Sequence, residues 1–435
     1  MENITYRGGE NFNLRDVLIN GRKRKLNERV ALFGTFISEK VDKIESLYSR
    51  VVNSACDREV EIIDAMTNTP RKMLMFGSNN YLGLANHPYV KEKVKEAINR
   101  YGVGIGGPPL LNGYTSLHRE LEENLSALKS QEDTLLFSSG YNANLGLVSG
   151  LVDKNDFVIH DEYSHASLCD GLKLARANSK SFKHNNIDEL RNIITDTEVC
   201  REKFICVEGV YSMDGDLAPL DEITQISHAS NSILIVDDAH GTGVMGKHGR
   251  GTGEHFNVEN LIDISMGTFS KAFGVVGGFV SGSKALISYL RFFARSYMFS
   301  ASLPPTVISA VLAGLEVIQN EPERIEKLHK NTEYLSLLLS EIGIKINSQT
   351  PIISVIVPQR IDIRKAAYEF HQSGIFLNAI EYPAVPISKQ RFRISLMADH
   401  RKEDLERLVE CLFTIWYKND NSYSTQNIIH TIPTI

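Results

Sequence analysis

Short apolar runs alternate with helical patterns through the middle of the chain. Runs of strand length occur at residues 134–137, 156–159, 204–207, 233–236 and 261–266. A helix before the first of them is marked by the spacing of Leu117, Leu121, Leu125 and Leu128. Alternation of strands and helices predicts an α/β fold with a mostly parallel sheet. Because ligands bind such sheets beyond the carboxyl ends of the strands, the residues after each run are candidates for chemistry.

The two ends of the chain follow other patterns. Apolar side chains recur at helical spacing at Ile37, Val41, Ile44, Tyr48 and Val51. This spacing predicts one amphipathic helix within an N-terminal helical segment, residues 1–70. Residues 71–303 are the expected large domain, and residues 304–418 a small C-terminal α/β domain. The polar residues 419–435 are expected to form a mobile tail.

Composition narrows the class of protein. The chain has 435 residues, of which 42% are hydrophobic and 23% charged, and its net charge is −6. These values are typical of globular proteins, and the mild acidity argues against nucleic acid as a partner. We expect no signal peptide and no transmembrane segment, because no apolar run is long enough. The five cysteines lack ligand spacing, so we expect no metal, reduced thiols and a cytoplasmic location.

The strand at residues 134–137 ends in a candidate phosphate site. Residues 138–144 read Ser-Ser-Gly-Tyr-Asn-Ala-Asn and enter an apolar helix. Small hydroxyl residues and a glycine at a helix N-terminus leave backbone N–H groups at the positive end of the helix dipole. The alternative is that these residues only cap the helix.

Three further strand ends carry histidines, serines and acids. Residues 160–167 include two histidines, residues 208–216 include Ser212, and Asp237 follows four branched apolar residues. An aspartate in that position is at least partly buried and needs a cationic or donor partner. A structural salt bridge would satisfy Asp237 as well as a ligand would, and single histidines in such places are more often structural.

The last strand end carries a lysine with no acidic neighbour in sequence. Residues 267–279 read Gly-Thr-Phe-Ser-Lys-Ala-Phe-Gly-Val-Val-Gly-Gly-Phe. In these surroundings Lys271 is expected to lose hydration and to have a lowered pKa, as an imine-forming amine requires. Taken alone, the stretch is more typical of a surface lysine on a glycine-rich turn.

Together these strand ends supply the groups that pyridoxal phosphate (PLP) needs. They provide an amine for an imine, a phosphate cradle, a buried carboxylate and imidazoles. A dinucleotide is the competing ligand, because residues 102–107 match G-x-G-x-x-G. That motif requires a strand before it and a helix after it. Here a helix precedes it and Pro108-Pro109 follows, so we reject a dinucleotide site.

The C-terminal region contributes one more candidate. Residues 391–395 read Arg-Phe-Arg-Ile-Ser, so that Arg391 and Arg393 share one face of a strand. An arginine carried inward by an otherwise apolar strand predicts a carboxylate partner, bound by the two-pronged guanidinium group.

Six stretches, taken in order, resemble the α-oxoamine synthases. They are residues 78–84, 161–167, 208–216, 237–243, 267–274 and the strand that carries Arg393. The resemblance spans about residues 40–416. It implies a PLP-dependent transferase of fold type I, and a homodimer with a shared active site. The implied reaction condenses an amino acid with an acyl thioester, releases the thiol carrier and CO2, and gives an α-amino ketone.

The resemblance also implies residue roles. Lys271 forms the imine with PLP and later takes the Cα proton, Asp237 keeps the pyridine nitrogen protonated, and His165 stacks on the ring. The other implied cofactor contacts are Ser139, Gly140, Tyr141, Ser212, His240, Thr268, Ser300 and Ser302. Ser300 and Ser302 are expected to reach the phosphate of the neighbouring subunit. Asn79 and Arg393 are expected to hold the substrate carboxylate.

The substrates are less well defined. Residues 106–113 lack the basic residue that many members carry beside the thioester site, so we hypothesise a longer-chain acyl-CoA or an acyl carrier protein as donor. Residues 298–302, 318–328 and 393–400 look closest to bacterial serine palmitoyltransferase-like members. The alternatives are 8-amino-7-oxononanoate synthase, glycine C-acetyltransferase and a secondary-metabolite synthase. An aminotransferase is the alternative from a different enzyme class.

Overall fold

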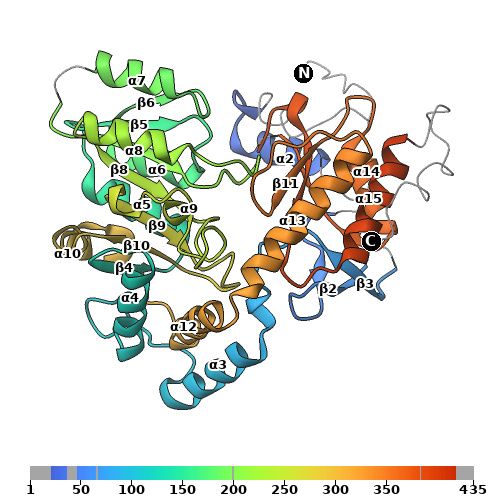
Figure 1. Cartoon of the computed structure of the whole chain (residues 1–435), viewed down its shortest axis with the longest axis horizontal. Coiled ribbons are helices and arrows are strands. Elements are labelled where there is room, and N and C mark those ends of the chain that lie inside the picture. The colour runs from blue at the N-terminus through green and yellow to red at the C-terminus, as the bar shows by residue number, and fades with distance from the viewer. Residues whose placement is uncertain (1–20, 37–46, 65–66, 198–199, 383, 418–435) are drawn as a thin grey trace.

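A seven-stranded sheet forms the centre of the larger half of the molecule (Figure 1). The computed structural model describes residues 21–36, 47–64, 67–197, 200–382 and 384–417. Across the sheet lie β4 (Asp133–Phe137), β10 (Gly278–Gly282), β9 (Ile264–Thr268), β8 (Ile233–Asp237), β7 (Lys203–Glu208), β5 (Phe157–Asp161) and β6 (Asn178–Phe182). β10 is antiparallel to β4 and β9, and the other neighbours are parallel. The predicted mostly parallel sheet is therefore confirmed.

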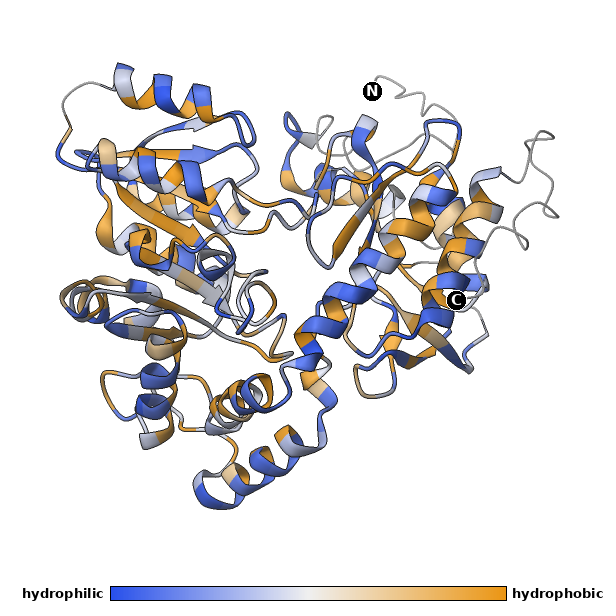
Figure 2. Ribbon diagram, in the orientation of Figure 1, coloured by the Kyte–Doolittle hydropathy of each residue, from blue (hydrophilic) through white to orange (hydrophobic). Residues whose placement is uncertain are grey.

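Helices cover both faces of this sheet because apolar side chains alternate along its strands. In β7, Phe204 and Cys206 belong to one apolar cluster, whereas Ile205 and Val207 belong to the other. The first cluster is closed by α5 (Gly140–Leu151), α6 (Ala166–Ala175), α10 (Lys284–Phe293) and α11 (Arg295–Met298). The second is closed by α7 (Ile187–Asp196) and α8 (Leu220–Ala229). Figure 2 shows these apolar strands between helices with polar outer surfaces.

The chain then crosses to a second half of the molecule. α12 (Pro305–Asn320) packs on α3 (Pro88–Tyr101) and α4 (Ser116–Leu128), and α13 (Glu323–Glu341) runs from there to the other side (Figure 1). Here β11 (Ile352–Ile356), β14 (Arg391–Ser395) and β13 (Asn378–Ile380) form an antiparallel sheet. α14 (Ile363–Gln372) and α15 (Lys402–Tyr417) pack on it through aromatic contacts of Phe392 with Phe370 and Trp416.

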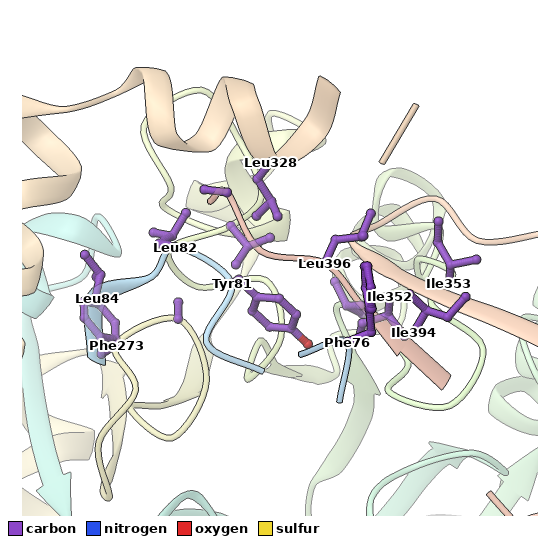
Figure 3. Packing of buried hydrophobic residues seen from close by; sticks show 14 of the residues in the cluster. Phe76, Tyr81, Leu82, Leu84, Phe273, Leu328, Ile352, Ile353, Ile394 and Leu396 are labelled. Carbon is purple, nitrogen blue, oxygen red and sulfur yellow. The ribbon is translucent and has the colours of Figure 1, made fainter. Parts of the chain in front are cut away.

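Segments from both ends of the chain share a third sheet. Its order is β1 (Val51–Val52), β2 (Glu59–Ile63), β3 (Pro70–Met75) and β12 (Ile375–Phe376), and β12 runs parallel to β3. A helix, α2 (Leu26–Phe36), precedes these strands. Figure 3 shows how the residues after β3 join the two halves. Phe76 lies with Ile394 and Leu396, and Leu84 lies beside Phe273 of the large-sheet side.

The structure differs from the sequence predictions mainly near the N-terminus. Residues 37–46, which carry most of the predicted amphipathic helix, lie outside the described residues, as do residues 419–435. The prediction that this helix extends to residue 51 is wrong, because Tyr48 lies in a turn and Val51 lies in β1. β1 and β2 were not predicted, because β1 has only two residues and β2 lies in the segment that was expected to be helical; both pair with neighbours in sequence. The domain boundaries remain a proposal.

Two strands of the large sheet were also missed. β6 reads Asn-Ser-Lys-Ser-Phe and is mostly exposed, so it lacks an apolar run. β10 reads Gly-Phe-Val-Ser-Gly and is fully buried, but its glycines made it resemble a loop. The rejection of a dinucleotide motif at residues 102–107 is supported by the structure, because α3 precedes it and Gly102 ends that helix at a φ of 75°.

Candidate active site

Lys271 lies on the loop between β9 and β10, at the carboxyl end of the parallel strands. The loop is closed by its own backbone. The Phe269 N–H donates to the Gly277 carbonyl at 3.0 Å, and the Gly274 N–H donates to the Lys271 carbonyl at 3.0 Å. The backbone that carries the lysine is therefore fixed by its own hydrogen bonds.

The electrostatic surroundings of Lys271 come from other strands. Burial lowers the pKa of the Lys271 amine to about 8, Asp237 and Glu208 oppose this shift, and Arg393 adds to it. The predicted lowering of the lysine pKa is thus confirmed. The two carboxylates near the amine were not visible from its sequence neighbours, because they lie at the ends of β8 and β7.

Asp237 and Asp238 are consecutive but have different partners. Asp238 is buried, and its Oδ2 lies 2.6 Å from the Lys129 ammonium group, while the Thr252 hydroxyl donates to its Oδ1 at 2.8 Å. Asp237 accepts hydrogen bonds from the Asn144 side-chain amide at 2.6 Å and from a backbone N–H. Within the described part of the chain Asp237 forms no ion pair. The structural salt bridge therefore belongs to Asp238, and Asp237 can serve a ligand.

His165 is joined to Asp237 through two side chains. The Asn144 amide also donates to the Ser167 hydroxyl at 2.9 Å, which lies 2.7 Å from Nδ1 of His165. The backbone N–H of Ser167 donates to the same Nδ1 at 3.3 Å, so Nδ1 is an acceptor. The neutral imidazole consequently carries its proton on Nε2.

The predicted phosphate cradle lies at the N-terminus of α5. The Ser139 hydroxyl accepts from the Asn142 N–H at 3.1 Å and caps the helix. Within the described residues, the N–H groups of Gly140 and Tyr141 have no hydrogen-bond partner, so they are free at the positive end of the helix. Thr268 closes the other side, because a Cβ added at Gly140 would lie 2.9 Å from the Thr268 Cβ. Capping and free N–H groups thus occur together.

Tyr141 projects from the same helix start toward His165. Its ring lies edge-on to the imidazole, with centroids 6.4 Å apart, and its hydroxyl donates to Asp170. The Tyr141 side chain is 42% exposed, which leaves its ring face open to a ligand at this edge of the sheet.

Arg391 and Arg393 share a face of β14, as predicted, but only Arg391 is paired with an acid. Its Nη1 lies 2.6 Å from Asp214 Oδ1. Arg393 donates to the Ser212 carbonyl at 2.6 Å and to the Asn79 side-chain oxygen at 3.0 Å. Within the described residues no carboxylate lies within ion-pairing distance of Arg393, although only 6% of it is exposed.

His240 joins this group through Tyr81. The Tyr81 hydroxyl lies 2.8 Å from Nδ1 of His240 and also donates to the Asn79 side-chain oxygen at 3.3 Å. Burial, together with the charges of Lys271 and Arg393, lowers the pKa of His240 well below its usual value, so its ring is neutral. The hydroxyl of Tyr81 lies at the edge of the apolar group that holds its ring (Figure 3).

Ser300 and Ser302 are the predicted residues that the structure does not bring to Lys271. They line a separate cavity with Ser138, His118 and Tyr114. The Ser302 N–H donates to a backbone carbonyl in the 106–113 loop, at 3.0 Å, and its buried hydroxyl has no hydrogen-bond partner in the part of the chain that the structure describes. Their predicted contact with a neighbouring subunit stays a prediction.

Four residues that sequence reasoning missed support the site. Asn144 and Ser167 connect Asp237 to His165, Tyr81 holds His240, and Glu208 lies in register with Asp237 on the adjacent strand. Glu208 could have been found, because it ends an apolar strand as Asp237 does. Asn144 carries no such signal, since nothing local distinguishes it from a helix surface residue.

Comparisons with known proteins identify the family of the chain. The chain matches the family Aminotransferase class I and II over residues 71–412. It is 38% identical to serine palmitoyltransferase of Sphingobacterium spiritivorum over 395 residues, which is 91% of this chain and 97% of that protein. It is 37% identical to 8-amino-7-oxononanoate synthase 1 of Bacillus subtilis (strain 168) over 349 residues, which is 80% of this chain and 89% of that protein.

Solved structures give the same answer. Serine palmitoyltransferase of Sphingomonas wittichii superposes with a TM-score of 0.84 at 32% identity, over 90% of this chain and 98% of that one. A serine palmitoyltransferase with PLP as internal aldimine also gives 0.84, at 29% identity and the same coverage. The fold and the site thus define a PLP-dependent transferase of fold type I. Within that class, the chain belongs to the α-oxoamine synthases.

The residues present fit PLP, the cofactor of this class. Lys271 offers an amine with a lowered pKa, Asp237 offers a carboxylate free of any ion pair in the described residues, and the start of α5 offers two unbonded N–H groups. In the same described ranges, no group of three or more acidic, histidine or cysteine side chains is arranged to hold a metal. No helix among them combines the length and hydrophobicity needed to cross a membrane.

Proposed function

We propose that this chain condenses an amino acid with an acyl thioester, releasing CO2 and the thiol carrier, to give an α-amino ketone. The amino acid is glycine, L-alanine or L-serine, and the acyl donor is an acyl-CoA or an acyl carrier protein thioester. A serine palmitoyltransferase-like enzyme is favoured, because that relative aligns with 91% of this chain, against 80% and 86% for two 8-amino-7-oxononanoate synthases. The scattered cysteines favour a cytoplasmic location.

The observation that carries this proposal is the buried guanidinium of Arg393. Arg391, two residues away, is fully paired with Asp214. Arg393 has only neutral acceptors among the described residues: the Ser212 carbonyl, the Asn79 side-chain oxygen and the Ser395 hydroxyl. A buried arginine without an acid is poised for an anionic ligand, and a carboxylate suits its planar donors. Arg393 and Asn79 would hold the carboxylate of the amino acid near Lys271.

Three residues carry the reaction in this proposal. When bound, PLP supplies an aldehyde for the lysine amine and a ring that withdraws electrons from the substrate Cα. Asp237 would accept a hydrogen bond from the protonated ring nitrogen and so keep the proton there. Lys271 would take the Cα proton of the substrate at Nζ, for which a pKa of about 8 is well suited. His165 would hold the ring and donate a hydrogen bond from Nε2 to the substrate.

The remaining residues position the cofactor. Ser139, Gly140, Tyr141 and Thr268 would hold its phosphate and ring, and Ser212 and the neutral His240 would bind its phenolic oxygen. Ser300 and Ser302 would bind the phosphate of a second subunit. The enzyme is then a homodimer with a shared site, which gives a reason for the unpartnered, buried Ser302 hydroxyl.

The acyl donor would pass the loop of residues 106–113. The loop carries Pro108 and Pro109, and its Leu111 is 82% exposed, so it presents an apolar side chain and no basic one. We therefore favour a long-chain or carrier-protein donor over recognition of coenzyme A phosphates at this loop. Equal efficiency with a matched free acyl-CoA and the carrier-bound donor would rule out the carrier preference.

The second candidate is an 8-amino-7-oxononanoate synthase, because its identity to this chain, 37%, is nearly the same. An aminotransferase is the candidate of a different class, favoured only by the breadth of the matching family. It would convert the bound cofactor to the amine form with an amino acid alone. It would show no dependence on a thioester.

One experiment separates these candidates. Glycine, L-alanine and L-serine are added in turn to the purified enzyme while the cofactor absorbance is followed, and acyl-CoA thioesters of increasing length are then added. Products are weighed by mass spectrometry. We expect a thioester-dependent amino ketone and CO2 with one amino acid. Turnover with a 2-oxo acid and no thioester would contradict the proposal and favour the aminotransferase.

A further inference from the structure

A small cavity, bordered by both apolar and polar side chains, lies behind Asp237, between the large sheet and the helices α5 and α6. Asn144, Ser164, Glu208 and Asp237 are among the residues that line it. It leaves about 10 Å³ for the centre of a water molecule, which is room for roughly one water. Apart from Asp237 and His165, which also line it, no residue assigned a role toward the cofactor borders this cavity.

Three polar atoms around the cavity have no hydrogen-bond partner within the described residues. They are Oε1 of Glu208, Oδ1 of Asn144 and the hydroxyl of Ser164. Glu208 is only 5% exposed and Asn144 only 1%. Buried polar atoms in folded proteins are almost always hydrogen-bonded, to protein or to ordered water. A single water, with up to four hydrogen bonds, can satisfy all three.

The other ends of the same side chains hold the active site. The Asn144 Nδ2 donates both to Asp237, at 2.6 Å, and to Ser167, which lies against Nδ1 of His165. The backbone N–H of His165 lies close enough to the Glu208 carboxyl group to oppose the rise of its pKa. Asn144 therefore connects the cavity to Asp237 and, through Ser167, to His165, and Glu208 connects it to the backbone of His165.

We propose that Glu208 is a positioning residue: with one water in this cavity it holds the Asn144 amide, and thereby fixes how Asp237 and His165 face the cofactor. The inference rests on the roles proposed above for Asp237 and His165. The water anchors Asn144 Oδ1, so that Nδ2, and not the oxygen, faces the Asp237 carboxylate.

A neutral Glu208 completes the hydrogen bonds of this water, and its surroundings favour that form. Burial, and then the charge of Asp237, raise the pKa of Glu208 well above its usual value; Lys271 and the His165 N–H oppose this, and Asp161 adds to it. The neutral Glu208 donates its carboxyl proton to the water, and the Ser164 hydroxyl donates another. The water then donates to Asn144 Oδ1, so each unpaired atom gains a partner.

Two substitutions of Glu208 test the proposal in the PLP-bound enzyme. Glu208→Gln keeps a neutral group that can donate to the water and accept from the His165 N–H. We expect the pKa read from the cofactor absorbance to stay within about 0.3 units, and the dissociation constant of PLP within about twofold. Glu208→Leu removes both the donor to the water and the polar group beside the His165 N–H. It should weaken PLP binding about tenfold or more and shift that pKa by about 1 unit.

The control is Glu202→Gln, which removes a charge from an exposed residue just before β7. A fall of about 1 unit in the absorbance pKa of Glu208→Gln would show that Glu208 is ionised and would overturn the proposal. Unchanged binding in Glu208→Leu would do the same. If Glu208→Leu does not fold, a high-resolution crystal structure of the PLP-bound wild type tests the proposal instead. A water in the cavity is expected, and an empty cavity would contradict the proposal. Failure of the wild type to bind PLP would instead contradict the proposed function.

Discussion

Two polar regions meet at the end of β8, and they differ in how their charges are paired. Asp238 is buried against the Lys129 ammonium group and the Thr252 hydroxyl, so its charge and hydrogen bonds are satisfied within the protein. Asp237, the preceding residue, receives only neutral donors. Lys271 also lacks a direct ion pair in the described residues. The paired region is expected to determine stability and the unpaired one reactivity, and substitutions in each can test this division.

The strongest test is Lys271→Ala. We expect the rate of amino ketone formation to fall by about 10⁴-fold or more, because the substitution removes both the attachment point and the base. The cofactor should lose its absorbance band above 400 nm, characteristic of the protonated lysine imine. The urea midpoint should not fall, because a desolvated amine is removed. A variant with more than a tenth of wild-type turnover would contradict the role of Lys271.

Lys129→Met tests the paired region. It leaves the Asp238 carboxylate buried without a cation, which should cost about 3–5 kcal/mol of unfolding free energy. Urea unfolding followed by circular dichroism measures this loss. The folded fraction should keep its absorbance spectrum and KM, because no atom near Lys271 changes. Loss of activity without loss of stability would contradict the division between the two regions.

Arg393→Lys and Arg391→Lys form a matched pair. For Arg393→Lys we expect kcat/KM for the amino acid to fall about 10²–10³-fold, mostly through KM, because a lysine cannot make the two-pronged contact with a carboxylate. For Arg391→Lys we expect a loss of stability through Asp214 and little change in KM. Steady-state kinetics over a range of amino acid concentrations, together with urea unfolding, separates the two. Equal KM values for both variants would remove the argument for Arg393.

Gly278→Ala tests the phosphate cradle. A Cβ at this position would lie 2.7 Å from the Gly140 Cα, so the start of α5 must move. We expect PLP binding to weaken about tenfold, measured by titration of the apoenzyme. Gly282→Ala on the same strand is the control, because its Cβ would meet nothing closer than 3.3 Å. Equal affinities in the two variants would contradict the cradle assignment.

The smallest expected effect is a pH dependence from His184, which lies outside the unpaired region. Burial opposes its charge, but hydrogen bonds to Asp161 and Asp216 outweigh it and raise its pKa to about 9. A raised pKa stabilises the fold fully below about pH 6.5, and this contribution is lost as the pH rises through 9. We expect about 1 kcal/mol, reduced by screening because the ring is partly solvated. Urea midpoints at pH 6.5 and 9.5 should converge in His184→Gln, and an unchanged difference would refute the assignment.

Features that depend on residues close together in the sequence could be predicted from it, whereas features that depend on distant residues could not. The lowered pKa of Lys271 was predictable, because the residues beside it in sequence are small or apolar and include no acid. The partner of Asp237 was not, because Asn144 lies 93 residues away in the chain. The acids near Lys271 were hidden for the same reason, since β7 and β8 bring Glu208 into register with Asp237. β10 was not predicted from the sequence, because its glycines interrupt the apolar pattern of a strand. The same glycines allow close approach to α5.

The parallel pairing of β3 with β12 has a consequence for synthesis of the chain. Gly77, just after β3, accepts a hydrogen bond from the Asn378 amide at 2.8 Å, across 301 residues of sequence. At ribosomal speeds of about 5–20 residues per second, the strand edge of β3 waits roughly 15–60 s for its partner. During that interval the nascent chain exposes an apolar edge open to misassociation. A ribosome that stalls before residue 375 therefore yields a polypeptide in which the sheet of β1, β2 and β3 lacks β12.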